Sequence, residues 1–509
     1  MSDNILVRDV RPLDLTAATP TDAAPVDLRI RDGIITEIGV GLARGADETA
    51  LWADGRWALP GLWDRHVHLG QWALSTQRLD LSGTRSSAEV CAVLAEHLSR
   101  VPASGTTVQG YGHRTAIWDR QPSVAELDAV TGDVPTVLIS GDAHHGWLNS
   151  TALRLLGMGP RDGIVEEAEW FELYSRLSEL PGVGEPDDHQ VRRVLADAVR
   201  RGVVGLVDLE FAPNHERWAE RMALAGWVET PMPRIEAGIY PVDLDSALAT
   251  GLATGDPIHP GSDLVRLGPL KIISDGSLST RTAFCCEPYA DGSALSSPYG
   301  VCNVTPDELR ELLATAVRHR LTVALHAIGD AAVRDAVAAF DEAGATGSIE
   351  HAQLIGDAEI AAMARIGLVA SVQPAHLLDD VDAMQRCWPD RTDRCFRTHT
   401  MVEAGVDVRF GSDAPVARLD PWLAMAAAVH RGATDHPAWH PDEAVDVTTA
   451  LRCSTNGIDR LAVGGLGDVM VLDENPLSWQ GSSAEVAERL AQTEVAATVV
   501  SGRLAHAVW

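Results

Sequence analysis

Two histidines separated by one residue, His66 and His68, stand at the end of the apolar run LPGLWDRHVHL. In an extended strand, residues two apart face the same side, so both imidazoles can bind one metal ion, with Asp64 behind them on the same face. The chain has 18 histidines in 509 residues, so such a pair also arises by chance. The position of the pair in the fold must therefore decide its meaning.

Four further side chains suited to a metal site stand at the ends of later apolar runs. They are Lys271, His326, His351 and Asp413. Histidine and carboxylate groups are common ligands of divalent cations, and groups that converge from several strand ends define a site better than one short motif does. The sequence therefore predicts a metal site to which several strands contribute.

Lys271 can bind a cation only in a modified form, because an ammonium group is not a metal ligand. Between two metal ions its pKa falls, and the free amine can add carbon dioxide to give a carbamate, whose two oxygens suit a bridge. The alternative is a lysine paired with a carboxylate such as Asp275. We expect Asp413 to bind a metal and to accept a proton from water; the alternative is a structural carboxylate that accepts hydrogen bonds from loop amides.

These side chains lie at the ends of apolar runs that alternate regularly with amphipathic stretches. From about residue 200 onward, short β-branched runs alternate with Ala-, Leu- and Arg-rich stretches, which is typical of βα units around a parallel sheet. The seven runs cover residues 203–210, 233–240, 265–276, 321–330, 347–354, 368–376 and 406–415. With residues 57–69 as an eighth, the pattern predicts an α/β fold, a (β/α)8 TIM-like barrel whose strands end in polar residues at the catalytic face.

Residues 70–200 separate the first two predicted strands, whereas a βα unit needs roughly 30 residues. We expect this segment to be an α/β insertion over the barrel mouth. Its predicted elements are strands in TTVQGYG and PTVLISG and helices around 87–100, 150–157 and 187–201.

The two ends of the chain have the alternation of antiparallel strands, with Asp-Gly turns at 32–33 and 54–55. They are expected to combine into one small β-sandwich, formed by residues 1–56 and 455–509. Residues 57–69 and 201–454 are then left for the barrel.

Composition narrows the class of partner. The 72 acidic and 41 basic residues give a formal charge of -31, which repels nucleic acids and anionic membranes, so a small-molecule substrate is expected. The start of the chain lacks the pattern of a secretion signal, and the longest apolar run covers only residues 422–429. Seven cysteines without a CxxC pair favour a reducing cytoplasm. A homodimer is the default expectation for an enzyme of this size.

Several longer motifs carry a family resemblance across nearly the whole chain. They are LPGLWDRHVHL, SGDAHHGWLNSTAL, GPLKIISDGSLSTRTAFCCEPYAD, LTVALHAIGDAAV, IEHAQLI, ASVQPAH and GSDAPV. With these motifs the chain resembles the amidohydrolase superfamily, specifically its amidohydrolase-3 branch, which includes N-substituted formamide deformylases.

The resemblance implies metal ligation by His66, His68, His326, His351 and Asp413, with Lys271 as a carbamylated bridge. It further implies that the insertion brings His144 into the pocket, and only one of His144 and His145 can face it. Two zinc ions are expected, with manganese, iron or cobalt as alternatives. Asp413 and His144 are the expected catalytic groups.

The expected reaction is hydrolysis of a non-peptide amide, N-formyl or N-acyl amine by activated water. Alternatives on the same site are deamination, cyclic amide opening and lactone hydrolysis, and a silent binding protein is a further alternative. The residues expected to contact substrate are Trp63, Arg65, His144, Asp275, Arg281 and Gln373. Trp63, Arg65, His113 and Arg114 depart from the family pattern. Trp63, Trp118 and Trp147 would suit an apolar substituent if they line the pocket, and core packing is the alternative for them.

Overall fold

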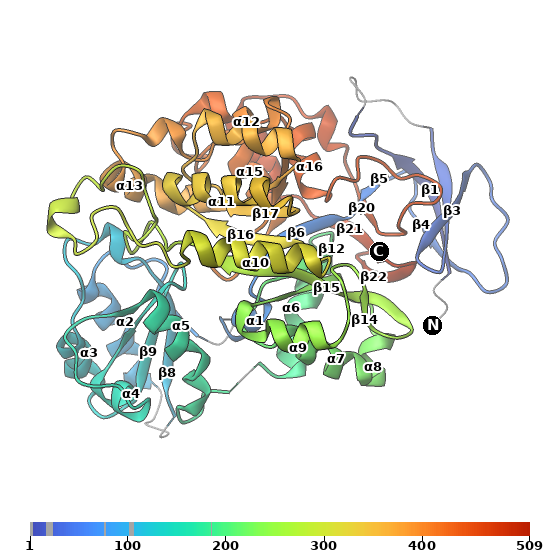
Figure 1. Ribbon diagram of the computed structural model, residues 1–509. Coiled ribbons are helices and arrows are strands. Elements are labelled where there is room, and N and C mark those ends of the chain that lie inside the picture. Colours follow the sequence, from blue (N-terminus) through green and yellow to red (C-terminus); the bar gives the residue numbers. More distant parts are fainter. Residues whose placement is uncertain (1–3, 17–23, 76–77, 101–105, 185) are drawn as a thin grey trace.

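A barrel of eight parallel strands forms the centre of the molecule (Figure 1). The computed structural model describes residues 4–16, 24–75, 78–100, 106–184 and 186–509. The barrel strands, in their spatial order, are β6 (Leu62–Val67), β12 (Val203–Asp208), β13 (Arg234–Ile239), β15 (Ser262–Ile273), β16 (Val323–Ala327), β17 (Gly347–His351), β18 (Val369–Val372) and β19 (Asp407–Phe410). The predicted α/β barrel is confirmed, and its strands occur in the predicted order.

The first and last strands close the barrel just beyond β19. The amide of Asp413 donates to the carbonyl of His66 (2.7 Å), and the amide of His68 donates to the carbonyl of Ala414 (2.8 Å). Gly411 makes this approach possible, because a Cβ there would lie 2.9 Å from the His66 nitrogen. Closure therefore brings the HxH segment and the Asp413 loop side by side.

The expected first barrel strand, residues 57–69, divides into two strands with different partners. β5 (Trp57–Pro60) pairs with β20 (Val469–Leu472) and with β1 (Ile5–Pro12), whereas only β6 pairs with β12. Gly61 separates them, and a Cβ there would lie 2.2 Å from the side chain of Val204. The barrel strand thus starts later than predicted.

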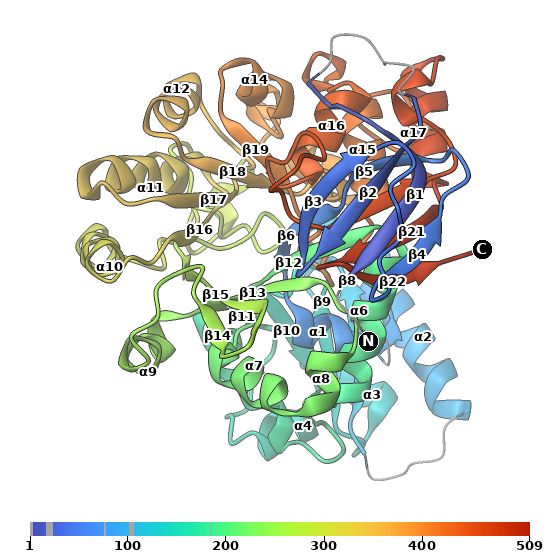
Figure 2. The ribbon, with the colours of Figure 1, turned by 90° about the vertical axis from the view of Figure 1, so that its right-hand side faces the viewer.

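Helices surround the barrel on its outside (Figure 2). They are α1 (Leu69–Ser75), α6 (Asp188–Arg200), α7 (Asn214–Ala223), α8 (Ala225–Glu229), α9 (Leu244–Ala249), α10 (Pro306–Arg318), α11 (Asp330–Ala343), α12 (Asp357–Ile366), α14 (Thr398–Glu403), α15 (Pro421–His430) and α16 (Val447–Ser454). The helix α13 (Leu377–Cys387) packs instead in a cluster with Ala116 of the insertion. Local signals set their ends: Thr305 and Glu308 form a capping box at the start of α10, and Gly344, with φ 62°, ends α11 in the left-handed conformation.

The helix α6 belongs with the barrel, although the sequence pattern placed it in the insertion. Its buried residues Val191, Leu195 and Ala198 join the main apolar core together with strand residues such as Leu206. Its position directly before β12 explains this, because a helix that leads into a barrel strand packs against that strand.

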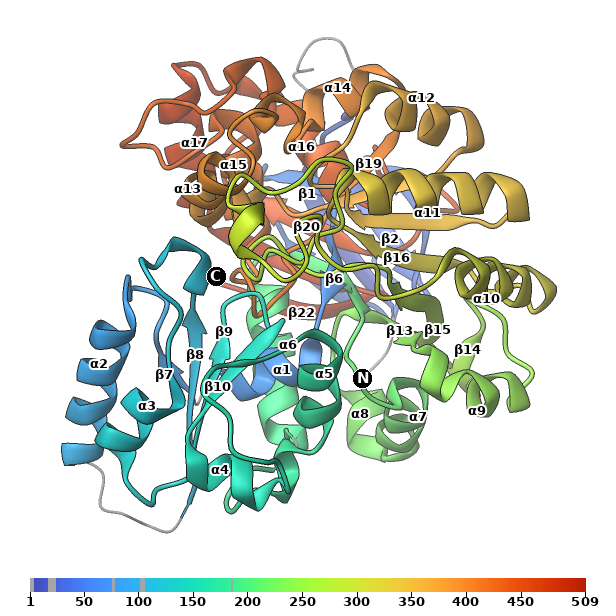
Figure 3. The ribbon, with the colours of Figure 1, turned by 60° about the vertical axis from the view of Figure 1, so that its left-hand side comes forward.

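The insertion has its own sheet and cores (Figure 3). The order of its strands is β11 (Val165–Glu166), β10 (His145–Leu148), β9 (Thr136–Ser140), β8 (Val108–His113) and β7 (Leu79–Asp80). Its helices are α2 (Ser87–Arg100), α3 (Val124–Thr131), α4 (Ser150–Leu155) and α5 (Glu167–Ser175). The predicted strands correspond to β8 and β9, and two predicted helices to α2 and α4.

Strands from both ends of the chain share one eight-stranded sheet beside the barrel (Figure 2). Besides β1, β5 and β20 it contains β2 (Val26–Arg31), β3 (Ile34–Gly39), β4 (Thr49–Trp52), β21 (Val495–Val500) and β22 (Arg503–Ala507). Side chains from both ends, such as Ile5 and Val499, form one buried cluster. The helix α17 (Ser483–Ala491) contributes Leu490 to the barrel core.

None of the helices in the described residues combines the length and apolar character that a membrane crossing requires.

Candidate metal centre

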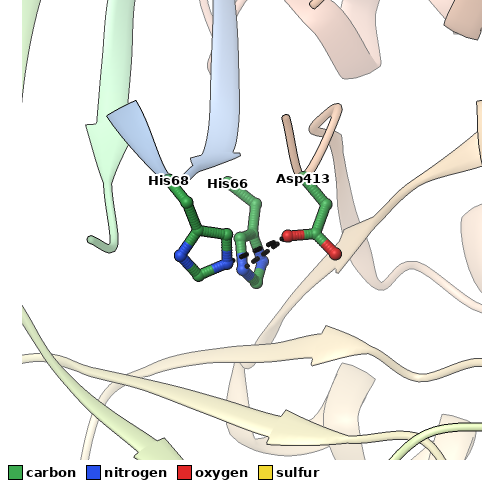
Figure 4. A group of neighbouring side chains, drawn as sticks. All are labelled: His66, His68 and Asp413. Atoms are coloured by element: carbon green, nitrogen blue, oxygen red, sulfur yellow. Dashed lines mark ion pairs between the residues drawn. The ribbon is translucent and has the colours of Figure 1, made fainter. Parts of the chain in front are cut away.

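His66, His68 and Asp413 meet where the barrel closes (Figure 4). Oδ1 of Asp413 lies 3.1 Å from Nε2 of His68 and 3.4 Å from Nε2 of His66. Both histidines come from the end of β6, since alternate residues of a strand face the same side. Three candidate ligand atoms thus converge on one point.

A second group shares the same carboxylate. His351, His376 and Asp413 each offer a ligand atom, and these atoms lie within 4.8 Å of one another. Oδ2 of Asp413 faces Nε2 of His376 at 3.9 Å. The two oxygens of Asp413 therefore face different histidines.

The backbone at two of these residues is in the left-handed region. Asp413 has φ 59° and His351 has φ 73°. Non-glycine residues held in this region are uncommon and gather at functional sites. The backbone thus leaves the extended conformation at the end of β17 and in the loop after β19, where these two side chains line the cavities of the site.

Lys271 is buried at the centre of the barrel, with its Nζ 3.3 Å from Nε2 of His66. It is the only lysine in the 509 residues, although the chain uses many arginines. Burial lowers its pKa, while the charges of Glu350 and Asp413 oppose the shift. A buried amine with a lowered pKa has the nucleophilic form that carbamylation requires.

His326 lies next to the other histidines but is oriented by a different set of contacts. Its ring centroid is 4.6 Å from that of His351. Its Nε2 faces two acceptors, the carbonyl of Gly276 (3.2 Å) and Oδ1 of Asp275 (3.4 Å). The Nε2 therefore carries the proton, and Nδ1 is the nitrogen left for an ion. Asp275 also accepts hydrogen bonds from the amides of Phe284 and Gly329, so it supports His326 from behind.

Burial sets the charge of the histidines. It lowers the pKa of His66, His326 and His351, so these imidazoles are neutral at neutral pH. Burial alone would raise the pKa of Asp413, but the facing imidazoles, His66 first, hold it well below its ordinary value. Neutral imidazole and ionised carboxylate are the forms that bind metal ions.

Unpartnered polar atoms provide a test of whether the site fits a metal. Oδ1 of Asp413, Nδ1 of His68 and Nε2 of His376 are buried without a hydrogen-bond partner in the described part of the chain. A buried polar atom without a partner costs about 1–3 kcal/mol, and an ion at the convergence point would remove that cost for the atoms that bind it. The residues present fit a divalent ion.

The insertion supplies His144, which is buried beside His326 with ring centroids 5.3 Å apart. Its Nδ1 faces Oε2 of Glu167 at 3.2 Å. Burial would lower the pKa of His144, but the charge and hydrogen bond of Glu167, with the charge of Asp142, raise it to about 9. His144 therefore carries a proton at neutral pH. His145 points elsewhere, with its Nε2 3.4 Å from the hydroxyl of Thr115.

Two cavities meet at this centre. One, of about 540 Å³ including space open to solvent, is lined by His66, His68, Gln71, Asp142, Ala143, His144, Phe171, Tyr174, Phe211, Tyr240, Lys271, Ile273, His326, His351 and Asp413. The other, of about 400 Å³, shares Asp142, His144, His326, His351 and Asp413 and adds Arg114, Ser277, Ser279, Gln353, His376 and Asp380 among others. A substrate in these cavities would contact both the barrel and the insertion.

Several residues expected to contact substrate lie outside these cavities. The ring of Trp63 packs against Gly205, and a Cβ on Gly205 would lie 2.3 Å from that ring. Arg65 forms an ion pair with Glu236 at 3.3 Å. Trp63 and Arg65 precede the inward-facing histidines by an odd number of residues, so they face outward. Arg281 pairs with Asp291 (3.0 Å), and Gln373 donates to the carbonyl of Ser371. His113, Trp118 and Trp147 form part of the core of the insertion.

Other residues of the site were not predicted from the sequence. His376 ends the motif ASVQPAH, and Glu350 directly precedes His351. Glu350 Oε2 lies 2.7 Å from Nδ1 of His66. Both residues lie inside motifs that carry the family resemblance, and their position in these motifs is the sequence signal that could have indicated them. Glu167 and the aromatic lining residues come from segments with no such motif.

Comparison with known proteins identifies the family. A model of the amidohydrolase family matches residues 53–506. The chain is 27% identical to the protein LONG AFTER FAR-RED 3 of Arabidopsis thaliana, over 98% of this chain and 91% of that protein. It is 25% identical to N-substituted formamide deformylase of Arthrobacter pascens, over 87% and 88%. A crystal structure of an uncharacterized metal-dependent hydrolase from Pyrococcus furiosus shares the fold, with a TM-score of 0.71 and 23% identity over 93% of this chain and 100% of that one. The chain belongs to the amidohydrolase family.

Proposed function

We propose that this protein hydrolyses the carbon–nitrogen bond of a small non-peptide amide, an N-formyl or N-acyl amine, with Asp413 as the base. The observation that carries the proposal is the position of Asp413. Its carboxylate faces the histidines of the first strand and borders both cavities. The similarity to the Arthrobacter deformylase supports the choice of bond.

The metal ligands follow from the two groups around Asp413. His66 and His68 with Oδ1 of Asp413 would hold one ion, and His351 with His326 or His376 would hold a second. Imidazole and carboxylate suit zinc and also manganese, iron or cobalt. Lys271, as a carbamate formed from its amine and carbon dioxide, would supply oxygens to both. When bound, such an ion polarises a carbonyl and lowers the pKa of water toward about 7.

The protein side chains then account for the proton transfers. Asp413 takes one proton from the attacking water, whose oxygen forms the new bond to the carbonyl carbon. As the carbon–nitrogen bond breaks, Asp413 returns that proton to the leaving nitrogen, so an amine and a carboxylic acid result. His144, protonated and held by Glu167, is placed to donate a hydrogen bond to the carbonyl oxygen as negative charge develops on it.

A substrate panel tests the proposal. Metal-reconstituted protein is assayed for amine release from N-formyl and N-acyl amines, with cyclic amides, lactones and aminated heterocycles in parallel, since these are the alternative reactions on the same site. Asp413→Asn should lower kcat by at least about 100-fold, while the circular dichroism spectrum stays unchanged. Release of amine by the variant at the wild-type rate would remove Asp413 as base. Absence of stoichiometric metal would favour a binding protein instead.

A further inference from the structure

The two cavities that meet at Asp413 differ in chemistry. We call the cavity with Phe171, Tyr174, Phe211 and Tyr240 the aromatic chamber. The cavity with Arg114, Ser277, Ser279, Gln353, His376 and Asp380 is the polar chamber, and its apolar lining residues are Leu278, Ile328 and Val416. Both reach the same catalytic carboxylate, so the two sides of a bond held at Asp413 lie in different surroundings.

The aromatic chamber presents ring surfaces. The rings of Phe211 and Tyr240 meet edge to face at 4.7 Å, and Phe171 lies 6.3 Å from Phe211. The tyrosine hydroxyls are engaged elsewhere: that of Tyr240 donates to the carbonyl of Leu209 (2.9 Å), and that of Tyr174 accepts from Arg78 (3.4 Å). The aromatic chamber therefore favours an apolar, ring-sized group, which gains contact area and edge-to-face packing with these rings.

The polar chamber presents hydrogen-bonding groups. Ser277 and Ser279 contribute hydroxyl groups to its lining, and the Gln353 amide donates to Asp380 (3.2 Å). Arg114 of the insertion closes the chamber through ion pairs with Asp379 (2.9 Å) and Asp380 (3.6 Å) of α13. Gln353 and Arg114 already have a carboxylate partner within the protein. An apolar group placed in the polar chamber would displace water from side chains such as Ser279 and Asp380 and offer them no hydrogen bond in return, which costs more than the lost contact itself.

We propose that the natural substrate carries an apolar, ring-sized group on one side of the scissile carbon–nitrogen bond and a hydrogen-bonding group on the other. The inference rests on the proposed function and makes it more specific. A simple N-substituted formamide has only a hydrogen on its acyl side, so it would leave one chamber empty. The preferred substrate is therefore a two-armed amide.

Isosteric amide pairs test this inference. N-benzyl-2-hydroxyacetamide is compared with N-benzylpropanamide, and N-(2-hydroxyethyl)phenylacetamide with N-propylphenylacetamide, so that each pair exchanges one hydroxyl for a methyl. The two pairs cover both orientations of the scissile bond. In at least one pair, kcat/KM should be about tenfold higher for the hydroxyl compound, because a site built for hydrogen bonds rejects the analogue that lacks them. N-benzylformamide should be slower than the better hydroxyl compound. Equal or higher rates for both methyl compounds would overturn the inference.

Variants assign the preference to the chambers. Gln353→Leu should lower the hydroxyl-to-methyl ratio at least about fivefold, and Phe211→Ala should lower the preference for benzyl over methyl amines by a similar factor. Leu155→Ala, 46% exposed on α4, is the control and should leave both ratios unchanged. Ser279→Ala replaces Gln353→Leu if that variant does not fold. Ratios that stay at the wild-type value in all chamber variants would contradict the assignment.

A binding measurement separates this inference from the proposed function. If the wild-type protein hydrolyses none of the amides, the proposed function fails. Calorimetric titration of the metal-loaded wild-type protein with the same four compounds then measures the contribution of the two chambers to binding alone. About tenfold tighter binding of one hydroxyl compound than of its isostere supports the two-armed ligand, and equal or absent binding overturns it.

Discussion

Oε2 of Glu350 lies 2.7 Å from Nδ1 of His66, and both side chains are only 1% exposed. The carboxylate fixes the proton of the imidazole on Nδ1, so Nε2 keeps its lone pair for an ion. Burial alone would raise the pKa of Glu350, but the hydrogen bond from His66, with a further one from Ser348, lowers it to about 2. Glu350 therefore stays ionised and orients His66 over the whole working range of pH.

Glu350→Gln should weaken metal binding without unfolding the protein. The amide oxygen can still accept from His66, but it lacks the charge that makes the imidazole a better ligand, so the affinity should fall about 10-fold. Competition with a chelator of known affinity measures this. Glu342→Gln, on the exposed part of α11, is the control and should bind as the wild type does. Unchanged affinity in Glu350→Gln would mean that Glu350 serves packing alone.

The metal-competent residues were visible in the sequence because each follows an apolar strand. A parallel barrel places the carboxyl ends of all its strands on one face, so His66, Lys271, His326, His351 and Asp413 had to converge once the strands were assigned. The strand pattern is local, and so the fold and this group of residues could be predicted. Their detailed geometry could not, since it depends on loops such as the one that gives Asp413 its φ of 59°.

The residues that the sequence did not indicate depend on contacts between distant segments. Glu167 meets His144 only through the fold of the insertion, and His376 meets Asp413 only when β18 and β19 lie side by side. The alternation of β6 that turns His66 inward turns Trp63 and Arg65 outward. Trp63 and Arg65 therefore lie outside the two cavities, contrary to the expectation that they contact substrate.

Lys271→Ala should lose part of the bound metal, and short carboxylic acids such as acetate should restore it in part by standing in for the carbamate. Metal per chain, measured by mass spectrometry of the dialysed protein, checks this. Because Lys271 is the only lysine, ¹³C-bicarbonate should give one side-chain carbamate resonance in the wild-type protein and none in the variant. Unaltered metal content and no carbamate signal would make Lys271 an ordinary structural lysine.

Asp468→Ala should destabilise the junction between the barrel and the terminal sheet. Nε of Arg234 on β13 donates to Oδ2 of Asp468 at 2.6 Å, and the two side chains are 6% and 3% exposed. Removing Asp468 leaves a buried guanidinium without its main partner, which costs about 3–5 kcal/mol in the free energy of unfolding. Asp263→Ala removes the second, 49% exposed partner of the same arginine and should cost less than about 1 kcal/mol. Equal costs in urea denaturation would contradict this ranking.

Acid should remove the contribution of Glu126 to the stability of the insertion. The hydrogen bond from Arg120, followed by those from Ser123 and Ser87, lowers the pKa of Glu126 to about 2, against a smaller opposing effect of burial. A carboxyl whose pKa is depressed on folding stabilises the protein fully above its unfolded value of 4.5 and loses that effect as pH falls toward about 2. Glu126→Gln should therefore be less stable than the wild type above pH ~5. The difference should be only ~0.5 kcal/mol, because the pair is partly exposed to solvent.

The difference in stability between the wild type and Glu126→Gln should close steadily on acidification. Glu488→Gln on α17 controls for the loss of one negative charge. A gap between wild type and Glu126→Gln that stays constant from pH 6 to pH 3 in thermal melts would show that the charge of Glu126 contributes nothing.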